Sequence, residues 1–236
     1  MRTLARRAEQ LLGIVVNIDL ASDEQLGNGP SIVISRHVHL SDVSLPALLY
    51  QRRGCVSRGV TMAELFADPG FDMLYQRTGS IFIGRDGSPD TAERVKPVAQ
   101  GLDEHTVAVI FPEGRFFRPA VLDRSLARLP RTHPARGERI EGLSHLLPPR
   151  PAGLLALIEA APEAEPVAMN HFGLDAAPSI RTLGSAAPLD LTITVIASRY
   201  ARSQNSSGDE EFITWLDVIW CEMDAALARF EKGRPS

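Results

Sequence analysis

Cysteine is rare in this sequence, because the 236 residues include only two, Cys55 and Cys221. Their spacing matches no metal-ligand motif, so the sequence indicates neither a disulfide framework nor a zinc cluster, and a reducing compartment is expected. Long hydrophobic runs are also missing, since no stretch approaches the roughly 18 to 20 apolar residues that cross a bilayer. We therefore expect a cytoplasmic protein without a membrane-spanning segment.

Lysine is almost absent as well, since only Lys96 and Lys232 are lysines among 25 cationic residues. The arginine fork suits phosphate recognition, but the same skew is typical of proteins encoded by GC-rich genomes. The net charge of −4 argues against a general nucleic-acid-binding protein, so no nucleic acid is expected as a partner. With 44% hydrophobic and 23% charged residues, the chain is predicted to form one globular domain over residues 1–236.

Apolar runs separated by turn residues predict the secondary structure. The expected strands are residues 13–22, 31–35, 80–84, 106–112, 165–172 and 189–198. The expected helices are residues 43–53, 88–104, 153–161 and 209–230. Strands that alternate with helices predict an α/β fold, a single layered domain with a mixed, mostly parallel sheet flanked by helices.

Two segments stand out from this pattern. Residues 115–153 contain eight arginines, several prolines and few apolar repeats, so we expect a long loop or lid with at most one short helix near residues 121–129. In residues 209–230, apolar side chains recur every three or four positions, which predicts a helix packed on the core. These side chains are Phe212, Trp215, Leu216, Ile219, Trp220, Met223, Leu227 and Phe230.

The stretch "SIVISRHVHLSDVSLP" (residues 31–46) places His37, His39 and Asp42 directly after an apolar strand. One interpretation is a metal site, which needs further ligands, and His133, His145 and His171 lie in no ligand motif. A second is a polar turn in which Asp42 or Ser41 caps a helix.

The third interpretation is a histidine–aspartate dyad. Asp42 in the first helical turn would accept a hydrogen bond from one ring nitrogen of His37, which leaves the other nitrogen as a free base. The carboxylate would also stabilise the imidazolium that forms when the base takes a proton. Because no serine or cysteine lies in a nucleophile motif, the base would act on a substrate hydroxyl.

Three later stretches resemble motifs of a known family. "GSIFIGR" ends in Arg85, "IFPEGR" contains Glu113, Gly114 and Arg115, and "EPVAM" covers residues 165–169. With the His-x4-Asp pair, and in this order, they resemble the four blocks of the glycerolphosphate acyltransferase superfamily, which includes the 1-acyl-glycerol-3-phosphate acyltransferases. The resemblance runs from about residue 32 to residue 169.

The resemblance implies a role for each matching residue. His37 is implied as the general base, Asp42 as its orienting partner and Arg85 as a ligand of the acceptor's phosphate. Glu113 and Gly114 are implied to shape the acceptor site. The third block usually continues Thr-Arg-Ser, whereas Arg115 here falls one place earlier. Pro166 and Val167 match the fourth block, which is linked to the acyl-donor side, and Arg150 is the nearest match to a basic position shortly before the helix of that block.

The predicted function is therefore acyl transfer in phospholipid biosynthesis. The donor is expected to be acyl-CoA or acyl carrier protein, the acceptor is a hydroxyl of a lysophosphatidate or lysophospholipid, and no metal or organic cofactor is expected. A metal-dependent hydrolase using His37, His39 and Asp42, or a non-catalytic lipid-binding module, remains the alternative. The basic segment "MRTLARRAEQLLG" predicts a weak peripheral contact with the inner face of the membrane.

Overall fold

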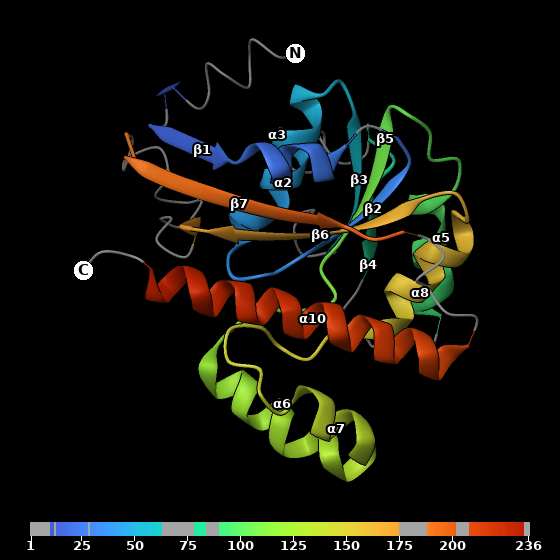
Figure 1. The fold of residues 1–236 in the computed structure, drawn as a ribbon. Helices are drawn as coiled ribbons and strands as arrows, with labels where there is room; N and C mark the ends of the chain where they lie inside the picture. The colour runs from blue at the N-terminus through green and yellow to red at the C-terminus, as the bar shows by residue number, and fades with distance from the viewer. Residues whose placement is uncertain are drawn as a thin grey trace.

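Seven strands pair into one sheet at the centre of the structure (Figure 1). The computed structural model describes residues 10–11, 13–27, 29–62, 78–83, 90–174, 188–201 and 208–233. The strands are β1 (Ile14–Ile18), β2 (Ser31–Ser35), β3 (Val56–Met62), β4 (Ile81–Ile83), β5 (Thr106–Ile110), β6 (Glu165–Phe172) and β7 (Leu191–Arg199).

The strand order is β1-β7-β6-β2-β5-β3-β4, and neighbouring strands are parallel except for the antiparallel pair β6 and β7. The centre of the sheet is shielded from solvent, since all five residues of β2 are buried. Near-continuous apolar strands of this kind are typical of parallel sheets with both faces covered. The predicted fold class, an α/β layered fold with a mixed, mostly parallel sheet flanked by helices, is confirmed.

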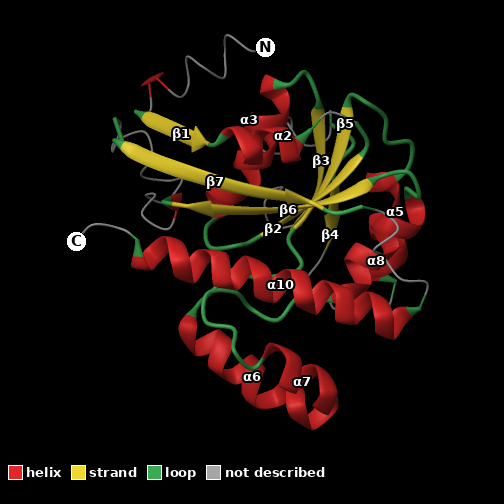
Figure 2. Cartoon of the chain, in the orientation of Figure 1, coloured by secondary structure: helices red, strands yellow, loops and turns green. Residues whose placement is uncertain are grey.

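Helices cover both faces of the sheet (Figure 2). They are α2 (Leu20–Leu26), the 3₁₀ helix η1 (Leu40–Val43), α3 (Ser44–Arg52), α5 (Thr91–Ala99), α6 (Pro119–Thr132), α7 (Pro134–Ile140), α8 (Pro151–Ala160) and α10 (Asp209–Lys232). Helices α2 and α3 lie on one side of the sheet, and α5, α8 and α10 lie on the other.

The two-residue period of the strands divides the core into two clusters. Ile32 and Ile34 of β2 pack with α5, α8 and α10, whereas Val33 between them packs with α2 and α3. The alternation continues across β5 and β6, so each face of the sheet has its own set of buried side chains. The site described below lies among residues that follow β2 and β5.

Residues 115–153 are largely helical, so the prediction of a long loop was wrong. Helices α6 and α7 form a hairpin that lies on the far side of α10 from the sheet (Figure 1). Each helix starts with a proline at its first position, Pro119 and Pro134, where the fixed backbone angle favours helix initiation. In this segment the prolines therefore mark helix starts, and the arginines mark a helix face exposed to solvent.

Three smaller expectations also need correction. The predicted strand at residues 13–22 ends at Ile18, because Asp19 accepts a hydrogen bond from the amide of Ser22 at 2.6 Å and caps α2. Strand β3 was not predicted, and the helix expected at residues 88–104 is observed at Thr91–Ala99 and ends well before residue 104. Most of the basic N-terminal segment "MRTLARRAEQLLG" lies outside the described residues.

The predicted C-terminal helix is confirmed, and it runs over Asp209–Lys232. It also buries two carboxylates, Asp217 and Asp224, that the apolar pattern did not reveal. Asp224 accepts hydrogen bonds from the backbone amides of Ser144, His145 and Leu146, and so fixes the segment that follows α7. No helix within the described residues is long and apolar enough to cross a membrane.

Candidate active site

The pairing of β2 with β5 brings two of the predicted residues together. Ile34 pairs with Ile110 in parallel register, and three residues further along each strand lie His37 and Glu113. The backbone amide of His37 donates a hydrogen bond of 2.6 Å to Oε1 of Glu113. Two motifs that are 76 positions apart in sequence therefore meet at the carboxyl ends of neighbouring strands, where open α/β sheets commonly place their sites.

The segment that follows β5 also contacts the carbonyl group and the imidazole ring of His37. The amide of Phe117 donates to the carbonyl oxygen of His37 at 2.7 Å. The imidazole contacts Phe111 and Phe116, with ring centroids 4.6 and 4.4 Å away, and 13% of its side chain is exposed. His37 is thus a fixed, partly accessible ring with aromatic neighbours.

Asp42 lies behind this ring and is fully buried. Its Oδ2 accepts the amide hydrogens of Val38 at 2.5 Å and His39 at 2.8 Å, and lies 3.3 Å from Nδ1 of His37. The aspartate therefore closes a tight turn and contacts the histidine with the same oxygen. This arrangement is the predicted dyad geometry.

The surroundings of Asp42 favour its ionised form. Burial acts to raise the pKa of Asp42, but the His37 hydrogen bond, the nearby His171 and the His39 amide outweigh it and hold the pKa below its usual value. A carboxylate here makes Nδ1 of His37 the donor, so Nε2 carries the free lone pair. Within the described part of the chain, Nε2 of His37 has no hydrogen-bond partner.

His39 has a different environment from His37. Its Nδ1 accepts the amide hydrogen of Ser41 at 3.2 Å, and His39 is the N-cap of the 3₁₀ helix η1. The N-cap of α3, expected at Ser41 or Asp42, is Val43, which has no side-chain cap. The described residues contain no group of three histidine, cysteine, aspartate or glutamate side chains that could hold a metal ion. The geometry thus gives the two histidines separate tasks.

Glu113 is 2% exposed and both of its oxygens accept backbone amides. Oε1 accepts from His37, and Oε2 accepts from Leu147 at 2.9 Å. Burial raises the pKa of Glu113 to about 8, although the Leu147 and His37 amides and the cation of Arg36 act in the opposite direction. This geometry favours a role in holding the His37 backbone over direct contact with a substrate, which the resemblance had implied.

Gly114 and two arginines form the rim next to Glu113. Gly114 adopts φ +64°, and a Cβ there would lie 3.2 Å from Nη1 of Arg150. Arg115 directly follows Gly114, and burial and then the charge of Arg115 lower the pKa of Arg150. Neither forms an ion pair with a described residue, so this rim offers two cations beside the turn.

The remaining predicted residues are placed as follows. Arg85 lies outside the described residues, so its position in the site is not described. Pro166 and Val167 are buried in β6, and Val167 pairs with Val33 in the sheet. The fourth block therefore forms part of the core.

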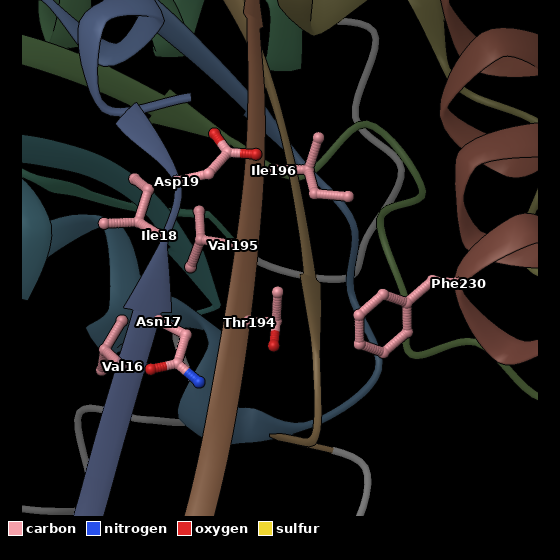
Figure 3. Close-up of a pocket in the computed structure, with 8 residues that line it drawn as sticks. All are labelled: Val16, Asn17, Ile18, Asp19, Thr194, Val195, Ile196 and Phe230. Carbon is pink, nitrogen blue, oxygen red and sulfur yellow. The ribbon is translucent and has the colours of Figure 1, made fainter. Parts of the chain in front are cut away.

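Two features of the structure, one in the site and one away from it, were not predicted from the sequence. The aromatic neighbours Phe111 and Phe116 follow β5, and their proximity to His37 depends on strand pairing. A hollow seen in Figure 3 lies at another part of the sheet, and no predicted site residue lines it. Its lining consists of Val16, Asn17, Ile18, Asp19, Thr194, Val195, Ile196 and Phe230.

The fold is similar to that of a solved acyltransferase. The crystal structure of the 1-acyl-sn-glycerophosphate (LPA) acyltransferase PlsC from Thermotoga maritima matches with a TM-score of 0.60 and 15% sequence identity. The match covers 100% of this chain and 79% of that chain. At this identity the likeness establishes a shared fold.

The sequence itself matches the model of the acyltransferase family over residues 17–169. The chain belongs to the acyltransferase family, which confirms the predicted family resemblance at this level, and acyl transfer is its class of activity. No curated protein is significantly similar in sequence to this chain. The matched range includes His37, Asp42, Glu113 and Gly114.

Proposed function

We propose that the enzyme transfers a fatty acyl group from a thioester donor, acyl-CoA or acyl carrier protein, to a hydroxyl group of a lysophosphatidate-type acceptor. The observation that carries this proposal is the His37–Asp42 dyad with an unoccupied Nε2. The similar solved structure from Thermotoga maritima is that of a 1-acyl-sn-glycerophosphate (LPA) acyltransferase, which supports the choice of acceptor.

In the proposed reaction, Nε2 of His37 takes the proton of the acceptor hydroxyl as the oxygen attacks the thioester carbonyl. The carbon–sulfur bond then breaks, and the imidazolium returns the proton to the leaving thiolate, so that an ester and a free thiol are formed. Asp42 stabilises the imidazolium between the two steps, because its carboxylate is 3.3 Å from Nδ1. This sequence needs no covalent acyl-enzyme and no metal or organic cofactor.

We propose that Arg115 and Arg150 contribute to binding the acceptor's phosphate, together with the Arg85 implied by the family motif. The support is that Arg150 lies beside the turn at Gly114 and that Arg115 directly follows this glycine, next in sequence to Glu113, which fixes the His37 backbone. Charge-assisted contacts from arginine to phosphate are strong and commonly bidentate. In the third block, Arg115 falls one place earlier than the arginine of the family motif. Arg150, from another part of the chain, would then supply a second cation for the phosphate.

Replacing Arg150 with alanine is expected to raise the acceptor KM by roughly tenfold or more, with a smaller effect on kcat, because a phosphate contact is lost. Arg85→Ala and Arg115→Ala are expected to act in the same direction. Lysine at position 150 should rescue only part of the loss, since it cannot reproduce the fork. Steady-state kinetics with varied acceptor tests this, and Arg229→Ala, which changes an exposed arginine in the last turn of α10, is the matched control. An unchanged KM in Arg150→Ala removes this residue from the site.

The proposed activity is tested with purified protein, acyl-CoA and acyl carrier protein as donors, and a panel of acceptors with and without a phosphate. Transfer to a lysophosphatidate-type acceptor is the expected result. Thioester hydrolysis that depends on added metal would support the hydrolase alternative. Binding of lipid with no turnover by either donor would support a non-catalytic lipid-binding module.

We further propose a weak peripheral contact with the inner face of the membrane. Residues 115–153 carry eight arginines and three carboxylates, although the whole chain has a net charge of −4. On α6 the exposed residues Arg124, Arg128 and Arg131 share one face at helical spacing, and no large hydrophobic side chain is exposed on the α6–α7 hairpin. Such a face would attract anionic headgroups without inserting into the acyl layer.

Changing Arg124, Arg128 and Arg131 together to glutamine is expected to weaken binding to anionic vesicles by about fivefold per arginine, since each basic residue near an anionic surface contributes roughly 1 kcal/mol. The measurement is co-sedimentation at low and high salt, with neutral phosphatidylcholine vesicles as the control. A chain lacking residues 1–10 tests the N-terminal contact in the same assay. Full binding by the triple variant and none by the truncated chain would assign the contact to the N-terminus alone.

A further inference from the structure

The two oxygens of Asp42 have unequal environments. Oδ2 accepts the amides of Val38 and His39 and contacts His37, whereas Oδ1 is buried and has no hydrogen-bond partner among the described residues. A buried carboxylate oxygen without a donor is costly, because it loses water and gains nothing in return. Nε2 of His171 lies 3.7 Å from Oδ1, which is too long for a hydrogen bond but close enough for an electrostatic contact.

The sheet places His171 opposite His37. Met169 pairs with Ser35 in parallel register, and two residues further along the neighbouring strands lie His171 and His37. His171 is fully buried in β6, and its Nε2 also lies 3.3 Å from the carbonyl oxygen of Arg36. Asp42 therefore lies between two imidazole rings, one at the partly open side and one inside the core.

The contacts of His171 define its tautomer. Since Nε2 faces a carbonyl oxygen and a carboxylate oxygen, the ring proton belongs on Nε2, while no described residue offers a partner to Nδ1. Burial lowers the pKa of His171 to about 4, and Arg36 and His37 act in the same direction, against the opposing effect of Asp42. The ring is consequently a neutral donor at neutral pH, with its N–H dipole directed towards the charge on Asp42.

We infer that His171 is a positioning residue for the reaction, and that its polar Nε2–H, 3.7 Å from Oδ1 of Asp42, stabilises the buried carboxylate electrostatically so that Oδ2 stays directed at Nδ1 of His37. This inference deepens the proposed function and rests on it. His171 touches neither the substrate nor the reacting atoms. It acts through Asp42, and it stabilises the state in which Asp42 is ionised and His37 is free to accept a proton.

The sign of the expected effect follows from the charges. The groups that act electrostatically on His171 are Asp42 from η1, Arg36 from the end of β2, and His37. The His37–Asp42 pair is negative before it takes a proton and neutral afterwards, so an N–H group near Oδ1 favours the unprotonated pair. Without this donor, the pair takes up its proton at a higher pH, and the acid limb of the kcat/KM profile moves upward.

The test compares His171→Gln with His171→Asn. A glutamine amide reaches the position of Nε2, whereas the shorter asparagine amide reaches only that of Nδ1, and both substitutions are polar. We expect His171→Asn to move the acid-limb midpoint upward by about half a pH unit or more and to lower kcat by about tenfold, because the N–H group near the Asp42 charge is lost and Asp42 is held less firmly. We expect His171→Gln to stay within about twofold of the unaltered enzyme in kcat and close to it in midpoint.

Asn170→Ala is the matched control for loss of a buried polar group. Asn170 precedes His171 in β6, but its Nδ2 donates to the carbonyl oxygen of Met223 in α10 and it has no contact with Asp42. This variant is expected to lose stability without any shift of the acid limb. Equal midpoints in the two His171 variants and the unaltered enzyme, in folded protein, overturn the inference.

A second measurement separates this inference from the proposed function. The ring signals of His37, followed by NMR as a function of pH in protein without substrate, report the coupling directly. If the pH midpoint of the His37 ring signals moves in His171→Asn but not in His171→Gln, the coupling is supported even if no acyl transfer is found. Absence of that shift rejects His171 as a positioning residue, whatever the activity of the enzyme.

Discussion

Replacing His37 with alanine is expected to lower kcat for acyl transfer by a factor of about 10² to 10⁴, the usual contribution of a general base. The effect on acceptor KM should be small, because the imidazole acts on the proton that moves in the transition state and contributes little to ground-state binding. Single-turnover kinetics with acyl-CoA and a lysophosphatidate-type acceptor measures this change on the chemical step itself.

His39→Ala is the matched control for this prediction. The two histidines are two positions apart, but the ring of His39 caps η1 through the Ser41 amide and is not in contact with the Asp42 carboxylate. Its loss should cost about 1 kcal/mol of stability, as for other helix caps, and change kcat little. If the two substitutions reduce kcat equally, the assignment of the base to His37 is wrong.

Asp217→Ala is expected to lower the free energy of unfolding by about 3–5 kcal/mol, because it leaves two guanidinium groups without their shared partner. Asp217 is 1% exposed and belongs to α10. Arg136 of α7 binds it through Nε at 3.0 Å and Nη2 at 2.9 Å, and Arg139 binds it through Nη2 at 3.2 Å. Arg136 is the more buried of the two arginines, so the cost falls mainly on its side chain.

Urea unfolding followed by circular dichroism measures this loss. Glu222→Ala is the control on the same helix, since its carboxylate forms an exposed contact with the hydroxyl of Tyr200 and its removal should change stability by about 0.5 kcal/mol or less. Arg139→Ala should cost less than Arg136→Ala, because Arg136 also donates to the carbonyl oxygen of Pro149. If Asp217→Ala lowers the free energy of unfolding by less than about 1 kcal/mol, the ion pairs of Asp217 with the two arginines do not attach the hairpin.

The dyad could be predicted from the sequence because it is local. His37 and Asp42 lie five positions apart across one turn, so strand end and helix start bring them together in any context that preserves both. Strands such as β2 and β5 were also recognisable, since they are continuous apolar runs. The order in which the strands pair is set by the whole sheet, and that order brings Glu113 to the His37 backbone.

The unpredicted parts depend on distant residues. His171 meets Asp42 across 129 positions of sequence, and nothing in its own neighbourhood indicates a polar partner. The α6–α7 hairpin was mistaken for a loop because of its prolines and arginines, although Val121, Leu122, Leu126 and Leu129 recur at helical spacing in α6 and pack on the core. Helix α7 is also attached by charged side chains, Arg136 and Arg139, that meet Asp217 on α10. Hydrophobic periodicity carries no information on such contacts.

The pairing of β1 with β7 has a consequence for how the enzyme is made. Among the described strands, β1 pairs only with β7, so the residues at Ile14–Ile18 emerge from the ribosome long before the partner at Leu191–Arg199 exists. The face of β2 and β6 that α10 covers is likewise bare until the last helix has been synthesised. The nascent chain therefore has an unpaired edge and an exposed apolar surface for most of its synthesis, which is the state that chaperones recognise. Catalytic competence should arise only after translation has passed residue 232, although the His37–Asp42 turn is among the first parts of the chain to appear.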